Sequence, residues 1–143
     1  MQITLEEIRS KLPYTKPFLF VDGLTRVDEN GVEGFYTFNK NAEFYKGHFK
    51  DNPITPGVLL TECMAQIGVV CLGIFLLGNA TDQTKIALSN QHIDFLKAVM
   101  PGEKVQVVSE KVYFRFGKLK CKVRMLNEAN ETVALGEISG MIV

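Results

Sequence analysis

The feature that most constrains the fold is a long apolar stretch from Val58 to about Leu77, which we expect to form a helix. Hydrophobic residues occupy nearly every side of this helix, so nearly all of its surface has to be buried. The exceptions are Thr61, Glu62 and Gln66. A single helix of this kind needs cover on most sides, and a curved antiparallel sheet wrapped around it would provide that cover.

The rest of the chain contains one short helical segment and several strand-like segments. Thr4 and Glu7 form the pattern of a capping box, which predicts a short helix that ends before Pro13. Strands are predicted where β-branched, aromatic or alternating residues are bounded by turn signals. These segments are 32–38, 105–116, 118–126 and 132–143, with a more mixed pattern over 85–95. Because no repeat or linker interrupts the chain, we expect residues 1–143 to form a single α+β domain.

The segment 118–125 alternates cleanly between basic and apolar residues, which predicts a strand with one polar and one buried face. The basic residues are Lys118, Lys120, Lys122 and Arg124. We also expect Lys111 and Arg115 to share a face of the preceding strand. Such a surface is either a solvated outer face of the sheet or a docking patch for an acidic partner, and both interpretations stay open.

The overall composition excludes several classes of protein. Sixteen basic residues balance sixteen acidic ones, which argues against a general nucleic-acid-binding protein. Three cysteines without a C-x-x-C motif indicate neither a disulfide framework nor a zinc site. The first residues lack the apolar core of a signal peptide, and the longest apolar run, 67–77, is too short to cross a bilayer. We therefore expect a cytoplasmic protein with no metal and no membrane partner.

Two residues are the strongest candidates for chemistry. His48 lies in a Gly-His-Phe loop, where an imidazole can act as a base near neutral pH or can simply be a hydrogen-bonded loop residue. Glu62 lies in the apolar helix, where a buried carboxylate costs several kcal/mol unless it is paired or protonated. Three explanations for Glu62 stay open. The helix N-terminus stabilises the carboxylate, the carboxylate forms a structural hydrogen bond, or Glu62 is a catalytic acid in a desolvated site. Gln66, one turn further on, could orient it.

The start of the same helix is a third candidate. The first N–H groups of a helix have no partner within it, and glycine lets a ligand approach the backbone closely. The amides of Gly57 and Val58 could therefore bind a carbonyl oxygen that becomes an oxyanion, although many helices begin with Pro-Gly. Cys63 follows Glu62 in sequence but points about 100° away around the helix, so we expect it to pack in the core.

The segment 47–66, GHFKDNPITPGVLLTECMAQ, resembles the signature of the β-hydroxyacyl-acyl-carrier-protein dehydratases. Leu12-Pro13, the segment 17–22, Asn41 and Pro101-Gly102 also match positions typical of that family, so the resemblance covers nearly the whole chain. The resemblance implies a hot-dog fold, in which a curved antiparallel sheet wraps around one long buried helix. It also implies a homodimer, which in some relatives assembles further into a hexamer as a trimer of dimers.

The resemblance further implies an activity and a site. His48 and the Glu62 of the other subunit would be the catalytic pair that dehydrates a β-hydroxyacyl thioester to a trans-2-enoyl thioester. Gly57 and Val58 would bind the thioester carbonyl, and no cofactor or metal would be needed. The partner would be an acyl carrier protein, for which the basic residues of 118–124 are the candidate docking patch.

Two departures from the family pattern and two alternative functions accompany this prediction. Lys50-Asp51 stands where the family usually has Pro-Gly, and Tyr14-Thr15 replaces the common His-Arg. These changes leave both a housekeeping fatty-acid enzyme and one of a specialised polyene, pigment or polyketide pathway open.

The alternative functions are a hot-dog acyl thioesterase and a non-catalytic acyl-binding subunit. The thioesterase would release free acid and thiol, whereas retention of both His48 and Glu62 argues against the non-catalytic subunit.

Overall fold

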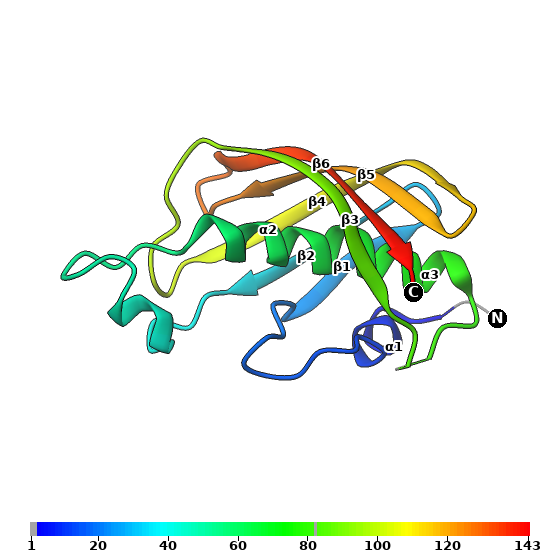
Figure 1. The fold of residues 1–143 in the computed structure, drawn as a ribbon, viewed down its shortest axis with the longest axis horizontal. Helices are drawn as coiled ribbons and strands as arrows, with labels where there is room; N and C mark the ends of the chain where they lie inside the picture. The colour runs from blue at the N-terminus through cyan, green and yellow to red at the C-terminus, as the bar shows by residue number, and fades with distance from the viewer. Residues whose placement is uncertain (1–2, 82) are drawn as a thin grey trace.

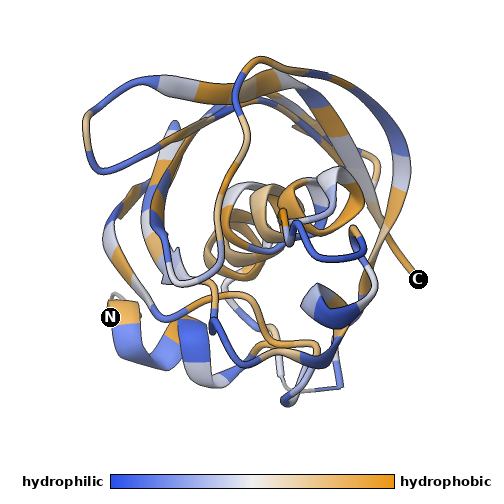
Figure 2. Ribbon diagram, turned by 90° about the vertical axis from the view of Figure 1, so that its left-hand side faces the viewer, coloured by the Kyte–Doolittle hydropathy of each residue, from blue (hydrophilic) through white to orange (hydrophobic). Residues whose placement is uncertain are grey.

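A six-stranded antiparallel sheet forms most of the structure, a computed structural model that describes residues 3–81 and 83–143. The strands follow the spatial order β1-β2-β4-β5-β6-β3, so β1 and β3 are its two edges. Their bounds are β1 (Gly23–Asp28), β2 (Gly31–Thr37), β3 (Ile86–Phe95), β4 (Lys104–Arg115), β5 (Lys118–Leu126) and β6 (Thr132–Ile142). The sheet curves around one central helix (Figures 1 and 2), as the sequence predicted.

The central helix runs from Gly57 to Leu77 as three consecutive segments. These are α2 (Gly57–Ala65), a π-helical segment (Gln66–Cys71) and α3 (Leu72–Leu77). The stretch is long and apolar enough to cross a membrane by length and composition, but 78% of its most apolar window is buried inside the protein. It therefore forms the core helix of a folded domain, in agreement with its predicted burial. Gly78, with φ of 75°, ends the helix in the left-handed conformation common at helix C-termini.

The short helix α1 (Leu5–Ser10) begins at the predicted capping box. The Glu7 N–H donates to Thr4 Oγ1, and the Thr4 N–H donates to Glu7 Oε1, both at 3.1 Å. The following segment, 11–22, contains no helix or strand and lies along the core helix (Figure 1). β1 comes next and was not predicted, because most of its residues are at least partly exposed and show no clean alternation.

The alternation predicted for β5 is confirmed. The side chains of Leu119, Cys121, Val123 and Met125 are buried beneath the sheet, and the basic side chains between them lie on its outer face.

The prediction that Lys111 and Arg115 share a face is wrong. Arg115 pairs with Lys118 on the outer face, whereas Lys111 pairs with the buried Cys121 on the inner face. A β-bulge at Val112 adds one unpaired residue to β4 and reverses the alternation beyond it.

Candidate active site

His48 lies in a loop that its own backbone holds closed. The loop follows a short 3-10 helix (Glu43–Lys46), and the His48 N–H donates to the Phe44 carbonyl at 3.1 Å. Further along, the Ile54 N–H donates to the His48 carbonyl at 2.9 Å. The Ile54 carbonyl in turn lies 2.9 Å from Nδ1 of the His48 ring. Two contacts with Ile54 thus fix both the backbone and the side chain of His48.

The contact with Ile54 determines the protonation pattern of the imidazole. A carbonyl oxygen only accepts hydrogen bonds, so Nδ1 must be the donor and must carry a proton. In the neutral ring the other nitrogen, Nε2, then has the free lone pair and is the basic atom. The ring also stacks on Phe49, with centroids 4.2 Å apart and planes inclined by 26°. His48 is therefore oriented as a base that uses Nε2.

The departure from the family pattern at Lys50-Asp51 preserves a tight turn. The backbones of Phe49 and Asn52 exchange two hydrogen bonds of 3.1 Å across it. Asp51 has φ of 57°, in the left-handed region that glycine adopts most easily. Aspartate is among the few other residues that visit this region. The substitution for the usual glycine therefore keeps the loop that positions His48.

The imidazole borders an open hollow of about 420 Å³ at the start of the central helix. Its lining includes His48, Gly57, Leu60 and residues 95–98, which form the end of β3 and the segment after it. Thr55 anchors the loop beside this hollow, since its N–H donates to the Val99 carbonyl at 2.9 Å. The participation of Phe95 and Leu96 in this wall was not predicted from the sequence.

Gly57 is the first residue of α2 and faces the same hollow. A Cβ atom added to it would lie 3.2 Å from the Phe95 ring, so glycine allows this close approach. Within residues 3–81 and 83–143, no hydrogen bond from the Gly57 or Val58 N–H is found. Both amides can therefore donate to an acceptor that binds at the N-terminus of the helix. The Val58 side chain itself is 77% exposed.

Glu62 is held by Gln66, as predicted. The Gln66 side-chain amide, Nε2, donates to Glu62 Oε2 at 3.0 Å and to the Phe18 carbonyl at 3.0 Å. Its oxygen, Oε1, accepts from the Phe20 N–H at 2.8 Å. Gln66 is fully buried, whereas Glu62 is partly exposed. A single glutamine therefore orients the carboxylate and ties the segment before β1 to the core helix.

The Glu62 side chain borders two spaces, and His48 borders neither. One is an open hollow of about 360 Å³ that also involves Tyr14, Lys85 and the first residues of β3. The other is a small cavity of about 40 Å³ between the core helix, β3 and β6. One chain therefore presents the two predicted catalytic side chains in separate places.

The three cysteines are buried thiols, as was expected for Cys63. Cys63 donates a weak hydrogen bond to the Phe20 carbonyl at 3.4 Å, and burial raises its thiol pKa far above the ordinary value. Burial likewise raises the pKa of Cys71 to about 12 and that of Cys121 to about 11. Thiols of this kind are poor nucleophiles. Among the described residues, no group of three His, Cys, Asp or Glu side chains is arranged to hold a metal ion.

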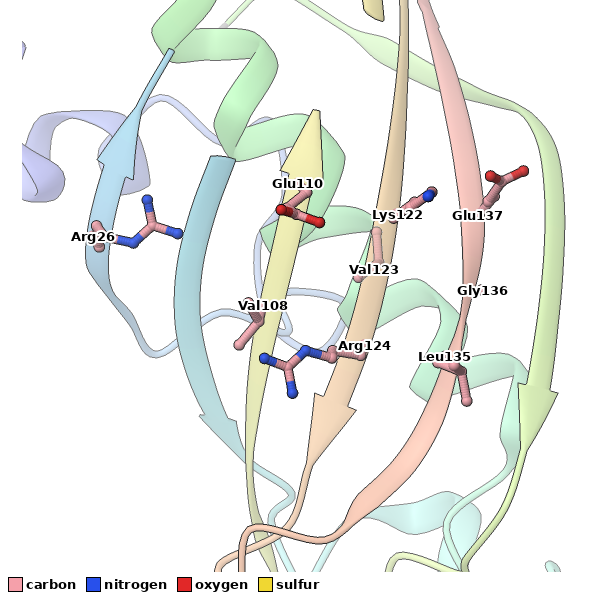
Figure 3. A pocket seen from close by; sticks show the side chains of 9 residues that line it. All are labelled: Arg26, Val108, Glu110, Lys122, Val123, Arg124, Leu135, Gly136 and Glu137. Carbon is pink, nitrogen blue, oxygen red and sulfur yellow. The ribbon is translucent and has the colours of Figure 1, made fainter. Parts of the chain in front are cut away.

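The predicted basic patch lies on the outer face of the sheet, apart from both hollows. A groove of about 540 Å³ crosses this face, and Lys122 and Arg124 line it together with Arg26 (Figure 3). Two carboxylates, Glu110 and Glu137, line the same groove (Figure 3). Glu137 also pairs with Lys120, with 3.3 Å between Oε1 and Nζ. The sequence pattern of β5 alone did not reveal these acidic neighbours, which come from β4 and β6.

Comparison with known proteins of similar sequence identifies relatives over most of the chain. A 3-hydroxyacyl-[acyl-carrier-protein] dehydratase, FabZ, of Acinetobacter baylyi is 36% identical over 123 residues, which cover 84% of this chain and 82% of that protein. The FabZ of Bacillus licheniformis is 34% identical over 141 residues, covering 92% and 95%.

Solved structures with the same fold are more distant in sequence. The dehydratase heterocomplex ApeI:P of Xenorhabdus doucetiae matches with a TM-score of 0.78 at 12% identity, covering 99% of this chain and 93% of the other. A thioesterase of Haemophilus influenzae matches with a TM-score of 0.70 at 12% identity, covering 100% and 92%. These likenesses confirm the hot-dog fold. Residues 12–135 match the FabA-like domain, and the chain therefore belongs to the FabA-like family.

Proposed function

We propose that this chain is a 3-hydroxyacyl-[acyl-carrier-protein] dehydratase, which converts a β-hydroxyacyl thioester into a trans-2-enoyl thioester and water. The FabZ proteins that it resembles along most of its length carry this name. The observation that supports the chemistry best is the hydrogen bond from His48 Nδ1 to the Ile54 carbonyl, because it leaves Nε2 as a base beside the free helix N-terminus. His48 and Glu62 are the proposed catalytic pair.

The proposed reaction is a β-elimination. The thioester carbonyl accepts a hydrogen bond from the Gly57 N–H, with the Val58 N–H as a second donor, and this interaction strengthens as the oxygen gains negative charge. His48 Nε2 removes a proton from C2, and the electron pair of the broken C–H bond forms the C2–C3 double bond. Glu62 donates its proton to the C3 hydroxyl, which leaves as water. Gln66 positions Glu62 for this step.

The two halves of this site come together in a homodimer that pairs the β3 strands. β3 is a sheet edge, and most of its residues are exposed. Leu88 at its start and Phe95 at its end are each about half exposed, so this edge of the sheet presents apolar side chains that a second copy could cover. Antiparallel pairing of two copies places the end of one β3 against the start of the other.

This pairing explains why one chain separates His48 from Glu62. The His48 hollow involves Phe95 at the end of β3, and the Glu62 hollow involves residues 86–88 at its start. A two-fold dimer therefore brings His48 of one subunit to Glu62 of the other. We also propose that residues 1–143 form a single domain and that the protein acts in the cytoplasm. Three such dimers would assemble further into a hexamer.

The proposed reaction is tested with His48→Ala and Glu62→Gln in the purified protein. Each change should lower the rate of enoyl thioester formation by roughly 10²–10⁴-fold and leave thermal unfolding unchanged, since each removes one proton-transfer group. Release of free acid and thiol by the wild-type protein would instead identify a thioesterase. Near-normal turnover in either variant would refute the assignment of that residue.

The shared site is tested by mixing the two inactive variants. Heterodimers formed from His48→Ala and Glu62→Gln subunits contain one intact pair, so part of the activity should return after dissociation and reassociation. Native mass spectrometry verifies that mixed dimers have formed. Mixed dimers without recovered activity would show that each site is built within one chain.

The carrier protein is proposed to dock on the basic residues of β5. Lys118, Lys120, Lys122 and Arg124 would attract its acidic surface, although Glu110 and Glu137 reduce the local positive charge. Changing Lys118, Lys120 and Lys122 together to Glu should raise KM for the carrier-bound substrate and leave a small thioester analogue unaffected. Equal effects on both substrates would point to damaged folding, and no effect would move the docking site elsewhere.

A further inference from the structure

Tyr14 lies where the two spaces beside Glu62 meet. Its side chain lines both the open hollow of about 360 Å³ and the small inner cavity of about 40 Å³. Among the described residues, the two spaces otherwise share only Glu62 and residues 86–88. An acyl chain that entered the open hollow and continued inward past Glu62 would therefore meet the ring of Tyr14.

The protein holds Tyr14 in this position from both sides. Leu12, two residues before it, is buried in the core. Four residues after it, the Phe18 carbonyl accepts the hydrogen bond from Gln66. The Tyr14 and Phe18 rings also contact each other, with centroids 6.4 Å apart. The glutamine that orients Glu62 thus also restrains the segment that carries Tyr14.

The inner cavity is lined mainly by small or apolar residues. Ala65 and Val69 of the core helix form one side, and Gly140 of β6 lies opposite. A Cβ atom on Gly140 would approach Ile86 Cγ2 to 2.8 Å and Val69 Cγ1 to 3.0 Å, so the absence of a side chain there keeps the space open. Since one water-sized sphere needs about 10–15 Å³ on this measure, a cavity of about 40 Å³ accepts only a few atoms.

We propose that Tyr14 is a specificity-determining residue, whose ring closes the inner cavity beside Glu62 and restricts the enzyme to short β-hydroxyacyl chains. The inference rests on the proposed dehydratase function. The chemistry of the ring suits this position, because its apolar face can pack against an acyl chain. Burial and, second, the Glu62 carboxylate raise the pKa of Tyr14 to about 12, so the phenol is neutral at physiological pH.

The test compares three variants on a series of 3-hydroxyacyl thioesters from four to fourteen carbons. Tyr14→Ala opens the inner cavity and should raise kcat/KM for long relative to short chains by roughly tenfold or more, the gain expected from about two additional buried methylene groups. Tyr14→Phe keeps the ring and should retain the wild-type length profile. Tyr113→Ala removes a tyrosine on the outer face of β4, near Arg115, and is the matched control. It should not change the profile.

Binding gives a second measurement that does not depend on turnover. Titration with saturated acyl-pantetheine thioesters of the same lengths should show tighter binding of long chains to Tyr14→Ala than to the wild-type protein. Thermal unfolding shows whether Tyr14→Ala is folded. If it is not, Tyr14→Leu, which also removes the ring, replaces it in both assays.

The outcomes separate the two proposals. A wild-type protein that dehydrates short chains, together with an unchanged length ratio in a folded Tyr14→Ala variant, would overturn the role of Tyr14 and leave the dehydratase function intact. A wild-type protein that already prefers acyl chains of ten or more carbons would likewise overturn the role of Tyr14 and leave the dehydratase function intact. A wild-type protein that forms no enoyl product at any length would overturn the dehydratase function, and the inference about Tyr14 with it.

Discussion

Replacing Gln66 with leucine tests how the core helix positions the candidate acid. Leucine has a similar size but lacks the amide, so the change removes three hydrogen bonds at once. These bonds join Gln66 to Glu62, to the Phe18 carbonyl and to the Phe20 N–H, at 3.0, 3.0 and 2.8 Å. Because Gln66 is fully buried, no water is expected to replace its amide without rearrangement of the core.

The expected loss of stability follows from the groups that are left without a partner. The Phe20 N–H is buried, and an unsatisfied buried donor costs about 1–3 kcal/mol. The Phe18 carbonyl is only partly buried and can reach water, so its loss adds less. Together we expect the free energy of unfolding to fall by about 2–4 kcal/mol. Ser109→Ala is the control, since it removes one buried hydrogen bond to the Gly68 carbonyl and should cost about 1 kcal/mol.

Urea unfolding at one fixed protein concentration measures both losses, because dimerisation would otherwise shift the apparent stability. In the folded Gln66→Leu protein, kcat should fall more than KM rises, since Glu62 keeps its carboxyl group but loses the residue that orients it. Ser109→Ala should leave kcat close to the wild-type value. The reasoning would be refuted if Gln66→Leu were no less stable than Ser109→Ala, or if its kcat were unchanged.

Two other predictions concern the loop turn and the buried thiols. Asp51→Val should lower the free energy of unfolding by about 1–2 kcal/mol, because a β-branched residue is strained at φ of 57°, whereas Lys50→Val should stay within about 0.5 kcal/mol; denaturant titration of both variants checks this. Burial raises the pKa of Cys71 to about 12 from 9.0, so the thiol ionises more readily in the unfolded chain. The stability that this thiol contributes should be complete below pH 9 and decline as the pH rises toward 12. Over the same pH range, the free energy of unfolding of the whole protein, measured by denaturant titration, should decline less in Cys71→Ala than in the wild-type protein.

The elements that could be predicted from the sequence are those whose residue pattern has a single physical cause, either burial of apolar side chains or a hydrogen bond between near neighbours. The core helix is apolar on nearly all sides, and burial is the only stable outcome for such a segment. In β5, strict alternation of Lys and Arg with apolar residues places the strand from Lys118 to Leu126, as the structure confirms. The capping box at Thr4 is equally local, since two side chains within one turn satisfy each other.

The elements that could not be predicted depend on partners distant in sequence. β1 has a weak pattern and is stabilised by pairing with β2 at a sheet edge. The bulge at Val112 leaves no signal in the composition of β4, yet it places Arg115 on the outer face although Lys111, before the bulge, lies on the inner face. The π-helical segment that begins at Gln66 also has no local signature, although such segments often occur at functional sites.

The candidate site combines both kinds of information. Because His48 and Glu62 lie in one continuous motif, spacing alone suggests that one chain brings the two side chains together, whereas the family resemblance implied a pair shared between two subunits. The structure instead directs them to opposite ends of β3, because His48 precedes the helix and borders Phe95, whereas Glu62 lies one and a half turns along and borders Ile86. The proposed pairing of β3 edges would bring the two side chains together, since an antiparallel copy exchanges the two ends of the strand. The proposed chemistry and the proposed dimer therefore depend on each other, and evidence against β3 pairing would count equally against a His48–Glu62 pair.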